Sequence, residues 1–200
     1  LVLHAGDFFF FFLLSQRYNG EQMIDVMNMM DGNEQAFDPY MFITFGNHEF
    51  EKDKMKHVGM LQSRIDESQF DWVGSNIHFK TGDNGQPVIQ SKNLVDDALV
   101  EVNGVKVGIV SATTQTKTAE YIESFAPTNE VIGRLTRELR GKGARLVIAI
   151  THQRVSEDEE MLSTLGKDAP DLVAGGHEHE RHLKQVDGHA LVKADSDVKS

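Results

Sequence analysis

Apolar runs that end in polar residues recur along the chain and predict most of its strands. Four such runs cover residues 1–5, 40–45, 146–150 and 172–174. Runs of this length, rich in Leu, Val, Ile and Phe and bounded by turn residues, are typical of buried strands. Each run is followed within a few residues by Gly, Asp, Asn, Thr or His. We therefore expect strand ends that carry polar chemistry, and we ask whether they converge.

Helical periodicity lies between these strands. Residues 21–30 and 52–65 place apolar side chains at the spacing of one helix face. In the first segment these are Met23, Ile24, Met27 and Met30, and in the second they are Met55, Val58, Leu61 and Ile65. Residues 128–140 and 156–165 are also expected to be helical, the latter with acidic residues in its first turn. Asn19 and Thr128 are the expected N-caps of their helices.

Two dipeptides predict hairpins. Asn103-Gly104 separates β-rich runs at 94–102 and 105–110, and Asp187-Gly188 separates runs near 183–186 and 190–193. Asn-Gly and Asp-Gly between such runs favour tight turns with positive φ. Alternation of strands and helices predicts an α/β layered domain. The hairpins indicate that its sheets are mixed and not purely parallel.

Composition narrows the chemistry. The chain has 200 residues, 40% of them hydrophobic and 26% charged, which suits one globular domain. Its net charge of -11 disfavours a nucleic-acid polymer as partner. A small phosphate ester is not excluded, because bound cations would reverse the local field. There is no Cys, so a metal would be held by His, Asp, Asn or Glu.

Residues 8–12 are five consecutive phenylalanines. They fit neither helical nor strand periodicity, and we favour a buried segment over a hydrophobic wall or flap near the site. The run is too short to cross a bilayer, and no transmembrane span or signal peptide is visible. Because the chain does not begin with Met and starts and stops inside predicted strands, we interpret it as one domain, 1–200, truncated at both ends.

The strand ends supply a set of metal-binding groups, namely Asp7, Asn47, His48, His152, His177 and His179. Oxygen and imidazole ligands without thiolate suit Zn²⁺, Mn²⁺ or Fe, and a carboxylate can bridge two ions. Each residue alone has an ordinary structural reading, as a turn residue, a cap or a surface imidazole. His177 and His179 are alternate residues, so on an extended segment they would point to the same side. The ordered set at strand ends is more specific than any member.

The ordered motifs carry a family resemblance. Gly6-Asp7, Gly46-Asn47-His48-Glu49, Thr151-His152 and Gly176-His177-Glu178-His179 resemble the calcineurin-like metallophosphoesterase superfamily. Finer features resemble its 5′-nucleotidase branch, namely Phe50, Asn76 and the stretch 102–108. The resemblance extends from Asp7 to Asp195. It implies mixed β-sheets packed as a sandwich flanked by helices.

The resemblance also implies roles for individual residues. Asp7 would bridge two metal ions, Asn47, His152 and His177 would complete one site, and His179 would belong to the other. His48 would be the catalytic imidazole. Glu51 stands where the family usually has the Asp that orients this imidazole. Glu49 would support a metal ligand without taking part in the chemistry.

Three departures from the family bear on metal binding and substrate. The family's initial Asp-x-His strand, which supplies two ligands, has no counterpart here, and His4 lies on the wrong strand to replace it. The C-terminal domain with which 5′-nucleotidases hold the base and sugar is also missing. The phenylalanine run replaces small and polar residues. We therefore expect two divalent ions (Zn, Mn, Fe, Mg or Ca) in the parent protein, and one or none tightly bound in this chain.

The resemblance implies a phosphoester hydrolase, first a 5′-nucleotidase that uses a metal-bound hydroxide with His48 assisting. The alternatives are a phosphodiesterase or sugar-phosphatase of the same superfamily, or a non-catalytic binding module with a degenerate metal site. The expected partner is a small-molecule phosphate ester such as a nucleotide, and the default location is exported, periplasmic or cell-surface. His57, His78, His182 and His189 are expected at the surface, and Arg154 and Arg181 contact either solvent or substrate phosphate.

Overall fold

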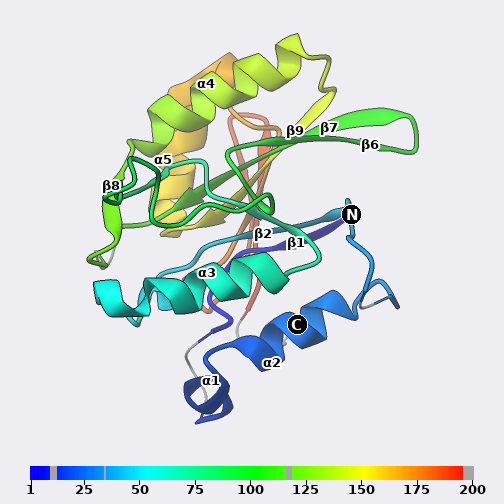
Figure 1. Ribbon diagram of the computed structural model, residues 1–200. Helices are drawn as coiled ribbons and strands as arrows, with labels where there is room; N and C mark the ends of the chain where they lie inside the picture. The colour runs from blue at the N-terminus through cyan, green and yellow to red at the C-terminus, as the bar shows by residue number, and fades with distance from the viewer. Residues whose placement is uncertain (10–12, 34, 116–118, 196–200) are drawn as a thin grey trace.

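The computed structural model describes residues 1–9, 13–33, 35–115 and 119–195. Two β-sheets lie face to face between two layers of helices, as Figure 1 shows. This arrangement confirms the predicted α/β layered fold with mixed sheets packed as a sandwich. Within the described residues, no helix is both long and apolar enough to cross a bilayer.

The first sheet is parallel and has the strand order β1-β2-β3-β5. Its strands are β1 (Val2–His4), β2 (Met41–Thr44), β3 (Asp71–Val73) and β5 (Leu94–Val95). Three helices cover its outer face, namely α1 (Leu13–Tyr18), α2 (Glu21–Asn28) and α3 (Val58–Glu67). Short 3₁₀ helices η1 (His48–Phe50) and η2 (Met55–His57) lead from β2 into α3.

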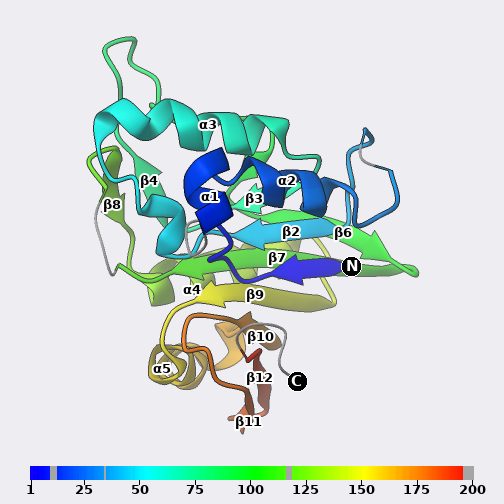
Figure 2. The same cartoon turned by 90° about the horizontal axis from the view of Figure 1, so that it is seen from below.

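The second sheet is mixed, with the order β11-β12-β10-β9-β7-β6. Its strands are β6 (Ala98–Val102), β7 (Val105–Thr113), β9 (Leu146–His152), β10 (Leu172–Gly175), β11 (His182–Val186) and β12 (His189–Lys193). Helices α4 (Thr128–Gly141) and α5 (Val155–Leu165) cover its outer face, and η3 (Gly166–Asp168) follows α5. Figure 2 shows β10 to β12 beside α5, away from α1 to α3. A separate two-stranded sheet pairs β4 (Ile77–Phe79) with β8 (Ile122–Phe125).

Apolar side chains fill the three spaces between the layers. The inner faces of the two sheets meet through Phe42, Val73, Ile109, Ile148 and Ile150, all fully or almost fully buried. Burial of this apolar area is the main stabilising contribution to the sandwich. Because β1, β2, β9 and β10 all contribute side chains to this apolar layer, their carboxyl ends are fixed relative to one another.

Aromatic packing accounts for part of the phenylalanine run. Phe8 stacks on Trp72 with ring centroids 5.4 Å apart, and Phe9 is completely buried against the same indole. Phe45 stacks on the indole at 4.7 Å. The prediction of a buried segment is thus confirmed for Phe8 and Phe9, while residues 10–12 lie outside the described residues.

The two predicted hairpins agree with the structure, but the expected run 94–102 is divided between β5 of the first sheet and β6 of the second. Strands β4 and β8 were not predicted, and several helix details differ as well. Asn103 and Asp187 take positive φ in the two predicted hairpin turns. Asn19 is not the cap of α2, because Gly20 holds that position and Asn19 accepts a hydrogen bond from Lys52 instead. Pro127, and not Thr128, holds the cap position of α4.

Three further expectations were wrong. Met30 and Met55 are exposed, because α2 ends at Asn28 and α3 begins only at Val58. The prediction that residues 177–179 form an extended segment also fails, since β10 stops at Gly175 and both His177 and His179 have positive φ. These two side chains are therefore not aligned by strand geometry.

Candidate metal centre

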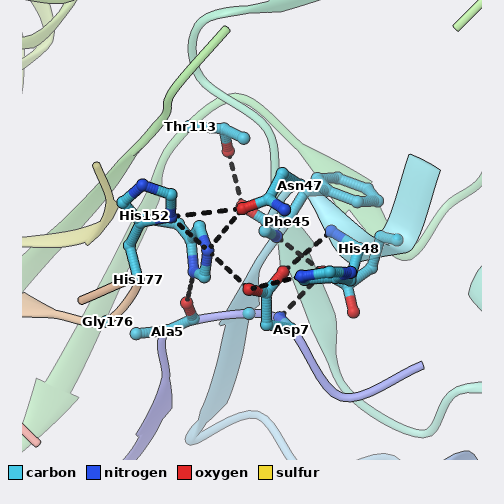
Figure 3. A network of polar contacts seen from close by, with 12 residues as sticks. Ala5, Asp7, Phe45, Asn47, His48, Thr113, His152, Gly176 and His177 are labelled. Carbon is cyan, nitrogen blue, oxygen red and sulfur yellow. Dashed lines mark hydrogen bonds and ion pairs between the residues drawn. The ribbon is translucent and has the colours of Figure 1, made fainter. Parts of the chain in front are cut away.

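The four predicted strand ends converge on one point (Figure 3). Asp7 follows β1 and Asn47 follows β2, so the first sheet supplies a carboxylate and an amide oxygen. His152 ends β9 and His177 follows β10, so the second sheet supplies two imidazoles. Since β1 and β2 are parallel, as are β9 and β10, each pair of tips lies at one edge of its sheet.

The donor atoms are close enough to share one cation. The His152 Nε2 atom lies 2.9 Å from Asp7 Oδ2 and 3.2 Å from Asn47 Oδ1. The His177 Nδ1 atom lies 3.2 Å from the same Asn47 oxygen and 3.3 Å from His152 Nε2. One carboxylate oxygen and the two imidazole nitrogens all lie within 4.8 Å of one another. A carboxylate, an amide oxygen and two imidazoles are suitable ligands for Zn²⁺ or Mn²⁺.

The hydrogen bonding of His152 fits a cation at this point. Its Nδ1 lies 2.5 Å from the carbonyl oxygen of Ala5, so Nδ1 donates a proton there. A neutral ring then points the Nε2 lone pair at the oxygens of Asp7 and Asn47, which are acceptors too. A carbonyl that orients a ligand imidazole in this way is the usual support of a metal site. Without a metal ion, the His152 ring needs a second proton, on Nε2, to make a favourable contact with the oxygens of Asp7 and Asn47.

The pKa shifts of the site residues agree with a second proton on the His152 ring. Burial opposes the charge on His152, but the hydrogen bond and charge of Asp7 outweigh it and raise the pKa of the imidazole. Burial likewise opposes the charge on Asp7, but the His152 contact and the His48 N–H hold its pKa below the usual range. Burial and the neighbouring His152 charge lower the pKa of His177. These shifts favour a proton on His152 and disfavour one on His177, and a cation would replace the proton between His152 and Asp7.

Close backbone contact between two glycine turns places Asp7 beside Asn47. A side chain at Gly6 would lie 2.3 Å from the Gly46 nitrogen, and one at Gly46 would lie 2.2 Å from Asp7 Oδ1. Asp7 itself has φ 62°, which is strained for a residue with a side chain. The His48 N–H donates to Asp7 Oδ1 at 2.8 Å and so fixes the carboxylate.

Glu49 holds both turns from beneath and is completely buried. Its Oε2 accepts from the N–H groups of Asp7 at 2.8 Å and Gly46 at 2.6 Å, and its Oε1 accepts from Phe8 at 2.9 Å and Phe9 at 3.3 Å. Burial and the Asp7 charge raise the pKa of Glu49, against the four N–H donors that favour its charged form. Its contacts agree with the expectation that it supports a metal ligand.

His48 and Glu51 form a second pair beside Asp7. The His48 Nδ1 atom lies 2.7 Å from Glu51 Oε1, so the longer glutamate arm does reach the imidazole. The His48 Nε2 atom lies 3.9 Å from Asp7 Oδ2, and a quarter of the side chain is exposed. A carboxylate at Nδ1 fixes the orientation of the ring and leaves Nε2 directed toward Asp7.

A cavity of about 950 Å³ opens beside the donor atoms. His4, Asp7, His152, His177 and His179 all contribute to its lining. His179 lies in this cavity but outside the close cluster formed by Asp7, His152 and His177. The Nδ1 atom of His4 accepts a hydrogen bond from the Gly6 N–H at 3.2 Å. Burial and the His152 charge lower the pKa of His4 to about 4, so this ring stays neutral at pH 7.

Two residues near the centre had no predicted role. Lys193 is almost fully buried and lies 2.9 Å from the completely buried carboxylate of Asp158. The sequence placed Lys193 at the end of a strand and Asp158 in the acidic first turn of a helix, where both have ordinary surface readings. Arg154 and Arg181, the two candidates for phosphate contact, are both exposed.

Comparisons with known proteins agree with this geometry. The family model for calcineurin-like phosphoesterases matches residues 1–181. A search of curated proteins found no match. Among solved structures, a 5′-nucleotidase precursor from Thermus thermophilus superposes with a TM-score of 0.73 at 20% identity, over 98% of this chain and 39% of that one.

Two other structures are similar to the same extent. NAD nucleotidase from Haemophilus influenzae gives a TM-score of 0.75 at 17% identity, over 98% of this chain and 40% of that one. The calcineurin-like phosphoesterase YfkN from Bacillus subtilis gives 0.69 at 17% identity, over 98% of this chain and 67% of that one. At these identities the likeness concerns the fold. The chain spans about two-fifths of the length of the two nucleotidases.

Proposed function

Because this chain belongs to the calcineurin-like phosphoesterases, we propose that it is the catalytic domain of a metal-dependent phosphoester hydrolase whose substrate is a nucleoside monophosphate. The observation that carries the proposal is the convergence of Asp7, Asn47, His152 and His177, with the His48–Glu51 pair beside them. The likeness to two nucleotidases supports the nucleotide over other phosphate esters.

The local charge supports a metal requirement. Asp7, Glu49 and Glu51 lie at or next to the proposed reaction centre, and the whole chain carries a net charge of -11. A phosphate dianion would be repelled from this surface unless cations neutralised it. A divalent ion held by the four donors would supply that charge and would acidify a bound water. His179, which also lines the cavity, is proposed to contribute to a second ion.

The chain's own groups would then act on the substrate as follows. The side-chain oxygens of Asp7 and Asn47 are held in place because Glu49 fixes the two turns that carry these residues. His48 extends its Nε2 toward the site while Glu51 holds Nδ1. From this position His48 would stabilise charge on the phosphoryl group or protonate the leaving oxygen.

The proposal is tested by phosphatase assays with Mn²⁺ or Zn²⁺ on the 200-residue chain and on any longer form of the protein. Substrates should include AMP, p-nitrophenyl phosphate, a sugar phosphate and bis(p-nitrophenyl) phosphate, so that monoester and diester hydrolysis are separated. His48→Ala and Asp7→Asn should each lower the rate strongly, while Glu101→Gln, an exposed change on β6, should not. Undiminished activity in both site variants would rule the proposal out.

A further inference from the structure

A buried lysine lies directly behind the two imidazole ligands. Lys193 is the last residue of β12, opposite Gly175 in the register of β10. Its ammonium donates to the carbonyl oxygens of Gln153 and Gly176, the latter at 3.0 Å. Gln153 immediately follows His152, and Gly176 immediately precedes His177. One ammonium therefore bonds to the backbone next to each imidazole.

The charge on this lysine is balanced locally. The Asp158 Oδ2 atom, from the first turn of α5, lies 2.9 Å from the ammonium, and Glu178 Oε2 lies 3.7 Å away. The Gln153 side chain donates to the other Asp158 oxygen at 2.8 Å. A buried ion pair gives little net stability compared with apolar side chains of the same volume, because both charges lose their hydration. Stability alone is therefore a weak reason for this pair.

The backbone that Lys193 holds is strained. His177 has φ 85°, a value that residues with side chains seldom adopt, and such strain persists only where surrounding contacts fix it. The Gly176 carbonyl bonded by Lys193 belongs to the peptide that leads into His177. The lysine stem also packs on Gly175, where an added side chain would lie 3.1 Å from Lys193 Cε. Lys193 thus contacts both residues before the strained histidine.

We propose that Lys193, supported by Asp158, is a positioning residue that sets the separation of His152 and His177 and thereby the metal affinity of the site. The proposal rests on the metal centre of the proposed function. Lys193 is not among the residues that line the cavity, so it would act on the site through the two carbonyls that it bonds. Loss of these bonds should release the His177 turn and weaken metal binding without removing any ligand.

Mn²⁺ affinity, measured by isothermal titration, tests the proposal without recourse to activity. Lys193→Met should weaken Mn²⁺ binding by about 10- to 100-fold, the usual effect of losing a group that orients a ligand. Lys193→Gln keeps two donors on a shorter arm and should weaken it less. Lys184→Met, on the neighbouring strand and partly exposed, is the matched control and should bind as the parent does.

A double variant separates positioning from folding. Lys193→Met combined with Asp158→Leu removes both buried charges, so it avoids the unpaired carboxylate that the single change leaves. It should fold and still bind Mn²⁺ at least about 10-fold more weakly than the parent. Parent-like Mn²⁺ affinity in this double variant, or in both single variants Lys193→Gln and Lys193→Met, overturns the positioning role. If Asp7→Asn leaves the parent's Mn²⁺ binding unchanged, the metal centre itself is wrong, and the proposed function fails with it.

Discussion

Replacing Glu49 by Gln tests whether the two ligand-bearing turns depend on a buried carboxylate. Within the part of the chain that the structure describes, each oxygen of Glu49 accepts hydrogen bonds from two backbone N–H groups. A glutamine can keep one oxygen, and the shorter bonds from Asp7 and Gly46 favour keeping it at the Oε2 position. Its amide NH₂ group must then face the N–H groups of Phe8 and Phe9, which lose their acceptor.

The expected loss of stability follows from those two bonds. A hydrogen bond to a charged group contributes about 1.5–3 kcal/mol, so two lost bonds correspond to roughly 3–6 kcal/mol. Removal of a buried charge offsets part of this, because the neutral amide has a smaller desolvation penalty. We expect a net decrease of about 3 kcal/mol in the free energy of unfolding. For a chain of this length that lowers the melting temperature by about 6–12 °C.

Thermal and urea unfolding at pH 7 without metal would measure this decrease. Glu51→Gln is the matched control, because it makes the same chemical change on a carboxylate that is 43% exposed and accepts no backbone N–H in this network. It should alter the free energy of unfolding by less than about 1 kcal/mol. A Glu49→Gln protein within about 0.5 kcal/mol of the parent would refute the role assigned to the buried carboxylate.

Three further outcomes are expected. His48→Ala should lower the turnover of p-nitrophenyl phosphate by about 10²- to 10⁴-fold, while titration shows Mn²⁺ affinity nearly unchanged; a parallel loss of both would make His48 a ligand. The pKa of His4 is about 4 in the folded chain, against 6.5 for an ordinary His, so below pH 6.5 the unfolded chain binds a proton that the folded chain does not, and stability falls as the pH drops. In urea unfolding, the His4→Phe variant should avoid about 2 kcal/mol of that loss at pH 5. Equal pH slopes in the variant and the parent would contradict this. Mn²⁺ at 100 times its dissociation constant should stabilise the parent by about 2.7 kcal/mol in melting experiments but not Asp7→Asn, and equal shifts would place the ion elsewhere.

The polar residues at the strand ends were predictable because they depend on short-range rules. Apolar runs that end in Gly-Asp, Gly-Asn-His and Thr-His mark buried parallel strands, and parallel strands bring their carboxyl ends to one edge. Parallel pairing thus brings Asp7 beside Asn47 and His152 beside His177, and the packing of the two sheets brings these pairs together. The contact between His48 and Glu51 was an expectation from the family resemblance, in which a carboxylate three residues after the imidazole orients it, and the 2.7 Å distance shows that the longer glutamate arm reaches the ring.

Other features depend on tertiary contacts that no local pattern contains. The burial of Lys193 requires β12 to lie beside β10 and α5 to place Asp158 against it, which involves three segments. The cap prediction for α2 failed for a related reason, since Asn19 accepts a hydrogen bond from Lys52, which is distant in the sequence. The cap of α4 differs only by one residue, because the helix begins at Thr128 itself. His177 and His179 are not on an extended segment because β10 ends at Gly175, before either residue, and both have positive φ.

The division of donors between the two sheets has a consequence for folding. Asp7 and Asn47 belong to one sheet, and His152 and His177 belong to the other, so neither sheet alone holds more than two of the four groups. A bound ion would therefore act as a cross-link between the two sheets, and it would join segments that are distant in the sequence, such as those of Asp7 and His152. Such a link forms only after long-range pairing is complete, which places metal capture late in folding. Metal affinity then reports the alignment of the whole sandwich, including substitutions in the apolar layer far from any ligand.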